Sequence, residues 1–125
     1  MNLNLYDAIG FNKIEEVLRL FYDQAVIDPL LAHFFFEKDI EELIQKQLVF
    51  TSILLGAKNL KYQGKPLKKV HERLNIRKVH LARRNVLMGE VMAQCGLPAD
   101  LATKWQSLEQ SLNSQISKDE AACND

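Results

Sequence analysis

Apolar residues recur at three- and four-residue steps along most of the chain, and this spacing restricts the fold more than any other feature. In the clearest example, the recurring residues are Ile14, Val17, Leu18, Phe21 and Ala25. They predict an amphipathic helix that ends near Asp28-Pro29. No segment alternates convincingly between apolar and polar residues, as a half-buried strand would. The chain is therefore predicted to be all-α.

A second helix is predicted after a short apolar corner, "DPLLAHFFF". Asp39 is a good N-cap for it, because its carboxylate can accept the first free backbone N–H groups. Gly56 lies where this helix should stop. The residues expected on its buried face are Ile40, Leu43, Ile44, Gln47, Phe50, Thr51 and Leu54.

Three further helices are expected in the second half of the chain. Pro66 can open a short one after a glycine-containing loop. Another should cover residues 78–94, where "CGLPAD" interrupts the pattern, and Pro98 should start the last. The last helix is expected to carry one apolar stripe of Leu101, Trp105, Leu108, Leu112 and Ile116. We expect one domain over residues 1–118 and a tail over 119–125.

Size and charge exclude several classes of protein. The chain has 125 residues, enough for one domain. Sixteen basic residues balance sixteen acidic ones, so nothing favours nucleic acid or an anionic membrane as partner. No apolar run approaches the roughly 20 residues that span a bilayer, and the N-terminus does not resemble a signal peptide. Cys95 and Cys123 suit free thiols in a reducing cytoplasm, so a cytoplasmic protein is expected. We also expect a monomer.

Three polar residues lie where the pattern predicts apolar side chains: Tyr22, Gln47 and His71. Each has an ordinary structural explanation when taken singly. A tyrosine at a helix edge can reach water, and a lone histidine is usually a surface or hydrogen-bonded core residue. A buried glutamine costs roughly 1–3 kcal/mol unless its amide is hydrogen-bonded. Together, the three side chains could surround a diatomic ligand of a metal, which accumulates negative charge and needs donors.

The histidines argue against zinc and are compatible with heme. The chain has only His33, His71 and His80, and none forms an HxxxH pair with a carboxylate as third ligand. Heme differs, because the porphyrin supplies four ligands and the protein needs to supply only one. One histidine beside a large apolar pocket is therefore sufficient.

Six segments carry a resemblance to a known family. They are "LYDAIG", "LFYDQAVIDPLLAHFFF", "LIQKQLVF", "LLGAKN", "YQGKPLKKVH" and "CGLPADL", spread from Leu5 to about Ile116. In order and spacing, the chain resembles the group I truncated hemoglobins. The resemblance implies a two-over-two helical sandwich around one heme b per chain.

The resemblance also implies roles for individual residues. His71 matches the proximal iron ligand, Tyr22 the distal tyrosine that bonds bound oxygen, and Gln47 the glutamine that supports it. Phe35 matches the phenylalanine stacked on the porphyrin, with Phe34 beside it. The other positions that match the heme enclosure are Leu43, Phe50, Leu54, Tyr62, Leu67, Val70, Ile76 and Leu81. His80 matches a histidine that is not an iron ligand and is expected to be hydrogen-bonded, and His33 is expected to face solvent.

Lys46 and Arg84 have two interpretations each. Some relatives place a residue at the position of Lys46 on the sixth site of iron, which requires a neutral amine despite a reference pKa near ~10.4. The interpretation we prefer is that Lys46 pairs with a heme propionate or reaches solvent. Arg84 stands where relatives have an apolar heme contact, so it either extends toward a propionate or the helix over 78–94 is rotated. Thr51 replaces a bulky aromatic that gates a tunnel in some relatives, so no tunnel gate is inferred.

Three functions from different classes follow. The first is a heme protein that reversibly binds dioxygen, as in oxygen transport, and also NO and CO. The second is a nitric oxide dioxygenase that converts NO and O₂ to nitrate and depends on an external reductase, because no flavin or nicotinamide motif is present. The third is a heme-free helical module that binds a partner. The same residues serve the first two functions, so the sequence barely separates them.

Overall fold

The computed structural model describes residues 4–58, 60–61, 71 and 74–116. In these residues it contains helices and no strand, which confirms the all-α prediction. The elements are α1 (Leu5–Ile9), α2 (Phe11–Ala25), the 3₁₀ helix η1 (Ala32–Phe35), α3 (Ile40–Leu54), α5 (Lys78–Gln94), α6 (Ala99–Gln110) and the 3₁₀ helix η2 (Asn113–Gln115). None of the helices described is long and apolar enough to cross a membrane.

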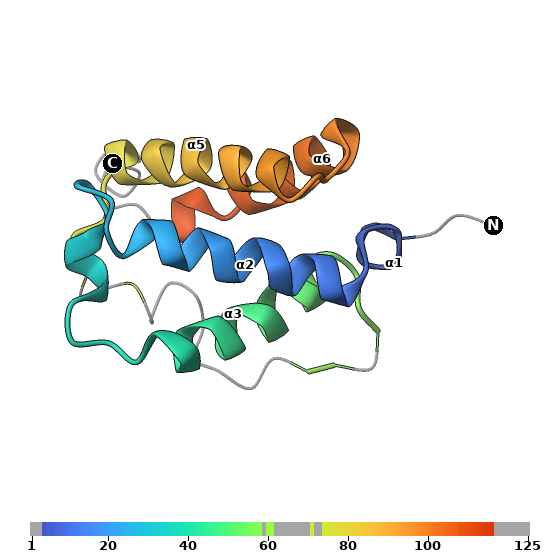
Figure 1. Cartoon of the computed structure of the whole chain (residues 1–125), viewed down its shortest axis with the longest axis horizontal. Coiled ribbons are helices and arrows are strands. Elements are labelled where there is room, and N and C mark those ends of the chain that lie inside the picture. The colour runs from blue at the N-terminus through green and yellow to red at the C-terminus, as the bar shows by residue number, and fades with distance from the viewer. Residues whose placement is uncertain (1–3, 59, 62–70, 72–73, 117–125) are drawn as a thin grey trace.

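The long helices are arranged around α2. Figure 1 shows α2 along the middle of the molecule, with α3 on one side and α5 and α6 on the other. Helix α2 packs against both α3 and α5, and α5 packs against α6. The predicted stripe of α2 faces this interior, and Ile14, Val17 and Leu18 are fully buried. Because α2 contacts both layers, its apolar face forms the centre of the hydrophobic core.

Helix α3 begins as predicted, and its buried face agrees with the prediction only in part. The Asp39 carboxylate accepts a hydrogen bond from the backbone N–H of Glu42 at 3.1 Å, which confirms the N-cap. The buried residues of α3 are Ile44, Leu48, Thr51 and Ser52, of which Ile44 and Thr51 were predicted. Gln47, Phe50 and Leu54, which were expected on the buried face, are half-buried. The helix has two apolar faces, and periodicity cannot tell which one meets the core.

The helix predicted over 78–94 is α5, with the same ends. The last helix was predicted too long, because α6 ends at Gln110 and η2 follows. The Ser111 hydroxyl donates to the carbonyl of Leu108 at 2.6 Å, a local bond that competes with helix continuation. Leu112 and Ile116 therefore do not continue the stripe of α6. The short helix expected from Pro66 lies outside the described residues.

Single glycines make two of the turns, and one of them is Gly56, where the sequence predicted a helix stop. Gly10 separates α1 from α2 with φ +90°, and Gly56 follows the end of α3 with φ +112°. A side chain strains the backbone in this region, so glycine is the residue that ends each element without a cost. At Gly56 the space is also tight, since an added Cβ would lie 3.1 Å from the Asn4 side chain.

Candidate functional site

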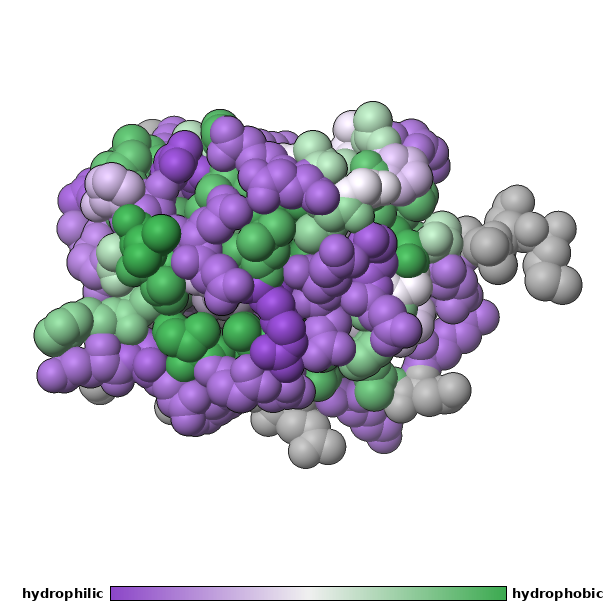
Figure 2. Space-filling view, in the orientation of Figure 1, coloured by the Kyte–Doolittle hydropathy of each residue, from purple (hydrophilic) through white to green (hydrophobic). Residues whose placement is uncertain are grey.

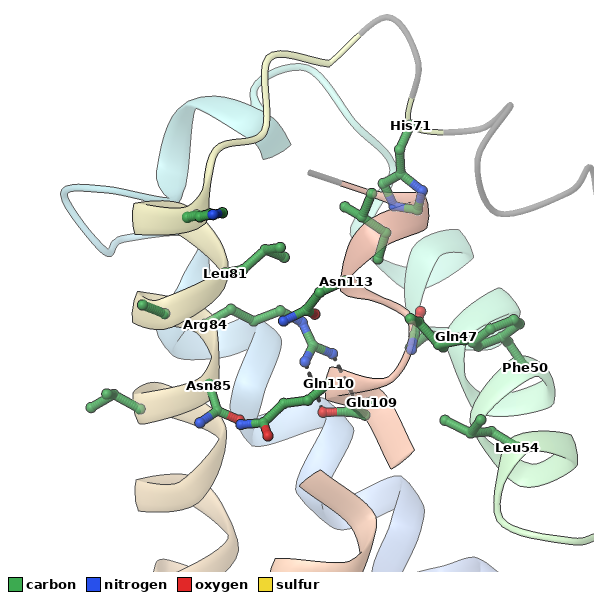
Figure 3. Close-up of a pocket in the computed structure, with 15 residues that line it drawn as sticks. Gln47, Phe50, Leu54, His71, Leu81, Arg84, Asn85, Glu109, Gln110 and Asn113 are labelled. Carbon is green, nitrogen blue, oxygen red and sulfur yellow. Dashed lines mark hydrogen bonds and ion pairs between the residues drawn. The ribbon is translucent and has the colours of Figure 1, made fainter. Parts of the chain in front are cut away.

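A cavity of about 640 Å³ lies among α3, α5, the α6–η2 region and His71. Figure 3 shows side chains of α5 on one side of it and side chains of α3 on the other, with His71 at one end. The residues that line it are Gln47, Phe50, Leu54, His71, Lys78, Leu81, Ala82, Arg84, Asn85, Val86, Glu109, Gln110, Leu112, Asn113 and Ile116. This volume is within the range of cavities that hold cofactors and other small molecules.

Much of the lining is apolar and only half-buried. Phe50 and Leu54 come from α3, Leu81 from α5, and Leu112 and Ile116 from the chain around η2. Apolar side chains that remain open to a cavity are stabilised when an apolar group excludes water from them. The second face of α3 is thus explained, because it borders the cavity while the first face packs in the core.

His71 and Gln47 bring nitrogen donors to this apolar lining. The His71 side chain is half-buried, and the backbone carbonyl of the same residue accepts a hydrogen bond from Leu74 N–H at 3.0 Å. The Gln47 amide nitrogen donates to the Thr51 hydroxyl, one turn later, at 3.1 Å. Gln47 was expected on the buried face of α3 but is half-buried, since it lines the cavity, whereas Thr51 lies in the core.

Tyr22 is buried beside the cavity and does not line it. Its ring makes edge-to-face contacts with Phe21 and Phe35, at centroid distances of 5.4 and 5.6 Å. Burial raises the pKa of the Tyr22 phenol, and the nearby Arg84 cation opposes part of this rise. Within the described part of the chain the hydroxyl makes no hydrogen bond, so it is a neutral donor available to a further group.

An ion pair that the sequence did not predict crosses the cavity lining. Arg84 of α5 donates to both carboxylate oxygens of Glu109 of α6, at 2.8 and 3.3 Å. The indole N–H of Trp105 also donates to Glu109, at 3.2 Å. One signal could have indicated Glu109: it lies four residues after the fully buried Trp105, on the same face of its helix. Neither interpretation of Arg84 included this partner.

The potential metal ligands in the cavity fit a heme. In the described part of the chain, no group of three or more His, Cys, Asp and Glu side chains could hold a metal ion by itself. The cavity offers one imidazole, from His71, among apolar side chains. Heme needs one protein ligand and an apolar enclosure for the porphyrin, so the residues present suit it.

Comparison with known proteins decides the family. Residues 4–118 match the family described as bacterial-like globin. The chain belongs to this family. It is 30% identical over 77 residues to a group 1 truncated hemoglobin of Tetrahymena pyriformis, a match that covers 61% of this chain and 63% of that relative, or less than two thirds of the relative's length. It is 28% identical over 102 residues to the group 1 truncated hemoglobin GlbN of Mycolicibacterium paratuberculosis, which covers 81% of this globin and 74% of that protein.

Solved structures of truncated hemoglobins share the fold. The Tetrahymena pyriformis protein in its Fe(III) form gives a TM-score of 0.86 at 21% identity, covering 92% of this globin and 98% of that chain. The truncated oxygen-avid haemoglobin of Bacillus subtilis gives 0.79 at 24% identity, covering 92% and 100%. These comparisons confirm the resemblance to truncated hemoglobins and the predicted all-helical fold. Membership of the globin family implies a heme cofactor and heme-based ligand binding.

The structure of this globin brings together five of the residues assigned to the heme site: Gln47, Phe50, Leu54, His71 and Leu81. Leu43 packs against the hydrophobic core, and Ile76 is buried, outside the cavity lining. Tyr62, Leu67 and Val70 lie outside the described residues.

Phe34 and Phe35 belong to the segment around η1. Phe34 packs against His33 and His80, at centroid distances of 4.0 and 4.9 Å. Phe35, besides its contact with Tyr22, lines a separate, open cavity of about 510 Å³. Figure 2 shows apolar residues at the surface near this end of the molecule, beside the polar residues that cover most of the visible face.

The two remaining histidines behave as expected. His80 is hydrogen-bonded, since its Nδ1 accepts from the backbone N–H of Arg77 at 2.9 Å, near the start of α5. His33 is exposed. Lys46 also points outward, with 71% of its side chain exposed and an ion pair to Glu42 at 2.8 Å on the same helix.

Proposed function

We propose that this globin binds one heme b in the described cavity and reversibly binds dioxygen there, with NO and CO as further ligands. The observation that carries the proposal is that the His71 imidazole shares one cavity with the apolar side chains of Phe50, Leu54 and Leu81. In a globin, this arrangement supports His71 as the proximal ligand.

The heme supplies an iron with one coordination position left for a diatomic ligand. The protein's part is to enclose this position and to offer hydrogen-bond donors. Phe50, Leu54 and Leu81 exclude water, which strengthens polar interactions inside the cavity.

Two donors are proposed for the bound ligand. The Tyr22 phenol stays protonated because its pKa is raised, and its hydroxyl makes no hydrogen bond within the described residues. The Gln47 amide has two N–H groups, and Thr51 takes one of them. Each hydrogen bond to a polarised ligand contributes about 1 kcal/mol or more, which should slow the loss of dioxygen. The ring of Phe35 holds Tyr22 from the side.

For Lys46 we propose the outward position. Its ion pair with Glu42 and its exposure support the interpretation in which the lysine reaches solvent and leaves the iron to an external ligand. We also propose that residues 1–118 form the globin domain, that 119–125 are a tail, and that the protein is cytoplasmic, where the buried free thiol of Cys95 stays reduced.

The test is the optical spectrum of the purified protein in its ferric, ferrous and oxygenated forms. The unchanged protein should show an intense Soret band, and His71→Ala should lose or greatly weaken heme retention. His33→Ala is the matched control, because His33 is exposed and outside the cavity. A colourless protein would refute the proposal and favour a heme-free binding module. Equal heme retention in both variants would refute His71 as the iron ligand.

Mixing the oxygenated protein with NO separates carriage from catalysis. Sustained nitrate formation with an added reductase would establish a nitric oxide dioxygenase. A single oxidation without turnover would leave reversible ligand binding as the function.

A further inference from the structure

The Arg84–Glu109 ion pair lies in the wall of the ligand cavity, away from the outer surface. Both residues line the cavity, and Figure 3 shows the Arg84 side chain extending toward Glu109 between the faces of α5 and α3. The Arg84 side chain is 29% exposed and the Glu109 side chain 10%. Of the two side chains, Arg84 is the more accessible, and it brings a cation to the cavity lining.

Holding α5 to α6 does not require these charges. Removing two charges from water is costly, and well-packed apolar residues often hold two helices as well as a buried ion pair does. The other side chains shared by this cavity, such as Leu81 and Leu112, show that the region accepts apolar residues. A charged pair at this place therefore points to a role in the cavity.

The pair is positioned from several sides. Trp105, which is fully buried, donates its indole N–H to Glu109 at 3.2 Å. The Arg84 guanidinium lies over the Phe21 ring, 5.1 Å from its centroid. A guanidinium carries five N–H donors, and two of the Arg84 donors reach Glu109. Among the described residues no further hydrogen bond of Arg84 is formed, so three donors remain on a side chain that lines the cavity.

We propose that Arg84 determines the ligand specificity of this cavity by binding small anionic ligands, such as azide or nitrite, and favouring them over neutral CO. Glu109 is a positioning residue that fixes the guanidinium and offsets part of its charge. The inference rests on the proposed heme site, since these ligands reach the cavity as ligands of its iron.

The selectivity has a simple electrostatic cause. A hydrogen bond between a guanidinium and an anion is charge-assisted, and a site from which water is excluded strengthens it. CO carries little charge and gains little from the same donor. The charge of Arg84 also reaches Tyr22, whose pKa it lowers against the effect of burial. The cation thus acts where the proposed distal donor lies.

The test measures azide binding to the ferric protein and CO binding to the ferrous protein, at constant pH and ionic strength. Arg84→Met should weaken azide binding by about tenfold and leave CO within about twofold. Glu109→Gln should have the opposite sign and tighten azide binding by about threefold or more, because the cation loses its compensating charge. Arg84→Lys should restore part of the azide affinity. A role in helix packing alone would not give opposite signs.

Arg83→Met is the matched control. Arg83 is the neighbouring residue on α5, and its ion pair with Asp28, at 2.6 Å, lies outside the cavity lining. Loss of this pair should leave azide affinity unchanged. The C–O stretching frequency of the CO complex gives a second readout, which should shift in Arg84→Met and Glu109→Gln and stay constant in Arg83→Met.

The outcomes separate this inference from the heme proposal. If the unchanged protein retains no heme, the proposed function fails, and a double-mutant cycle on unfolding of the heme-free protein still measures the Arg84–Glu109 coupling. Zero coupling there would overturn the placement of the pair. A normal Soret band with azide affinity within twofold in Arg84→Met would overturn the inference itself. Should Arg84→Met not fold, an unchanged azide affinity in Glu109→Gln would overturn it as well.

Discussion

The two apolar faces of α3 allow the same type of substitution, Leu→Ala, to be compared at two positions of one helix. Leu48 belongs to the core face and is 5% exposed, whereas Leu54 is half-buried and lines the cavity. Leu48→Ala and Leu54→Ala remove the same atoms from the same helix. We expect the first to act on the stability of the protein and the second on its hold on heme.

The expected magnitudes follow from burial. Leu48→Ala leaves a cavity in the core and should lower the free energy of unfolding by about 2–5 kcal/mol. Leu54→Ala removes a side chain that is open on one side in the heme-free protein, so its cost there should be about 1 kcal/mol. Bound heme stabilises the folded state by RT ln(1 + [L]/Kd), about 2.7 kcal/mol at a hundredfold excess over Kd. Leu54→Ala should reduce this increment, and Leu48→Ala should leave it unchanged.

The assay is guanidinium unfolding of each protein with and without heme, followed by far-UV circular dichroism. The difference between the two unfolding free energies of a variant measures its heme increment. Equal losses of heme-free stability in the two variants, or an increment that Leu54→Ala leaves intact, would refute the assignment of the second face to the cofactor.

Three further predictions concern four positions, of which the two glycines are compared with each other. Lys46→Ala should leave the ferrous spectrum unchanged, and a change from low-spin to high-spin would show that the lysine reaches the iron. Arg83 holds the pKa of the Asp28 carboxyl below its usual range. The ionised Asp28 carboxylate therefore contributes fully to the free energy of unfolding above the unfolded pKa of ~3.9. This contribution is lost as the pH falls through the lower folded pKa. Asp28→Asn should remove this acid-side loss, and a parallel pH profile of unfolding free energy would contradict it. Gly56→Ala should destabilise the protein by about 1–3 kcal/mol, because the residue has φ +112°, whereas the helical Gly89→Ala should stabilise it by about 0.5–1 kcal/mol in thermal unfolding.

Much of the fold could be predicted because it depends on neighbours in the sequence. The stripe of α2 is set by spacing at three and four residues, and the Asp39 cap acts on an N–H three residues away. Both ends of α5 carry local signals, with "CGLPAD" after its last residue. Where a local signal was ambiguous, the prediction was wrong, as at the end of α6, where the Ser111 hydroxyl bonds to the backbone instead.

The candidate site also has features that the sequence could predict and features that it could not. Tyr22, Gln47 and His71 were recognisable because polar residues in an apolar pattern are conspicuous. Periodicity could not show which side of α3 borders the cavity, because both of its faces are apolar; only the family resemblance assigned Gln47, Phe50 and Leu54 to the heme, and these residues line the cavity. The Arg84–Glu109 pair joins residues 25 positions apart, and no local spacing indicates such a contact.

The order and type of the helices and their caps thus follow from residues within a few positions of one another, whereas the heme-ligand candidate follows from the resemblance of the whole chain to truncated hemoglobins. The shape of the cavity, the side of α3 that lines it and the ion pair in its wall are decided by packing between helices that are distant in the sequence. Local spacing limits the backbone conformation of each segment, whereas the surroundings of a side chain depend on the helices that pack around it.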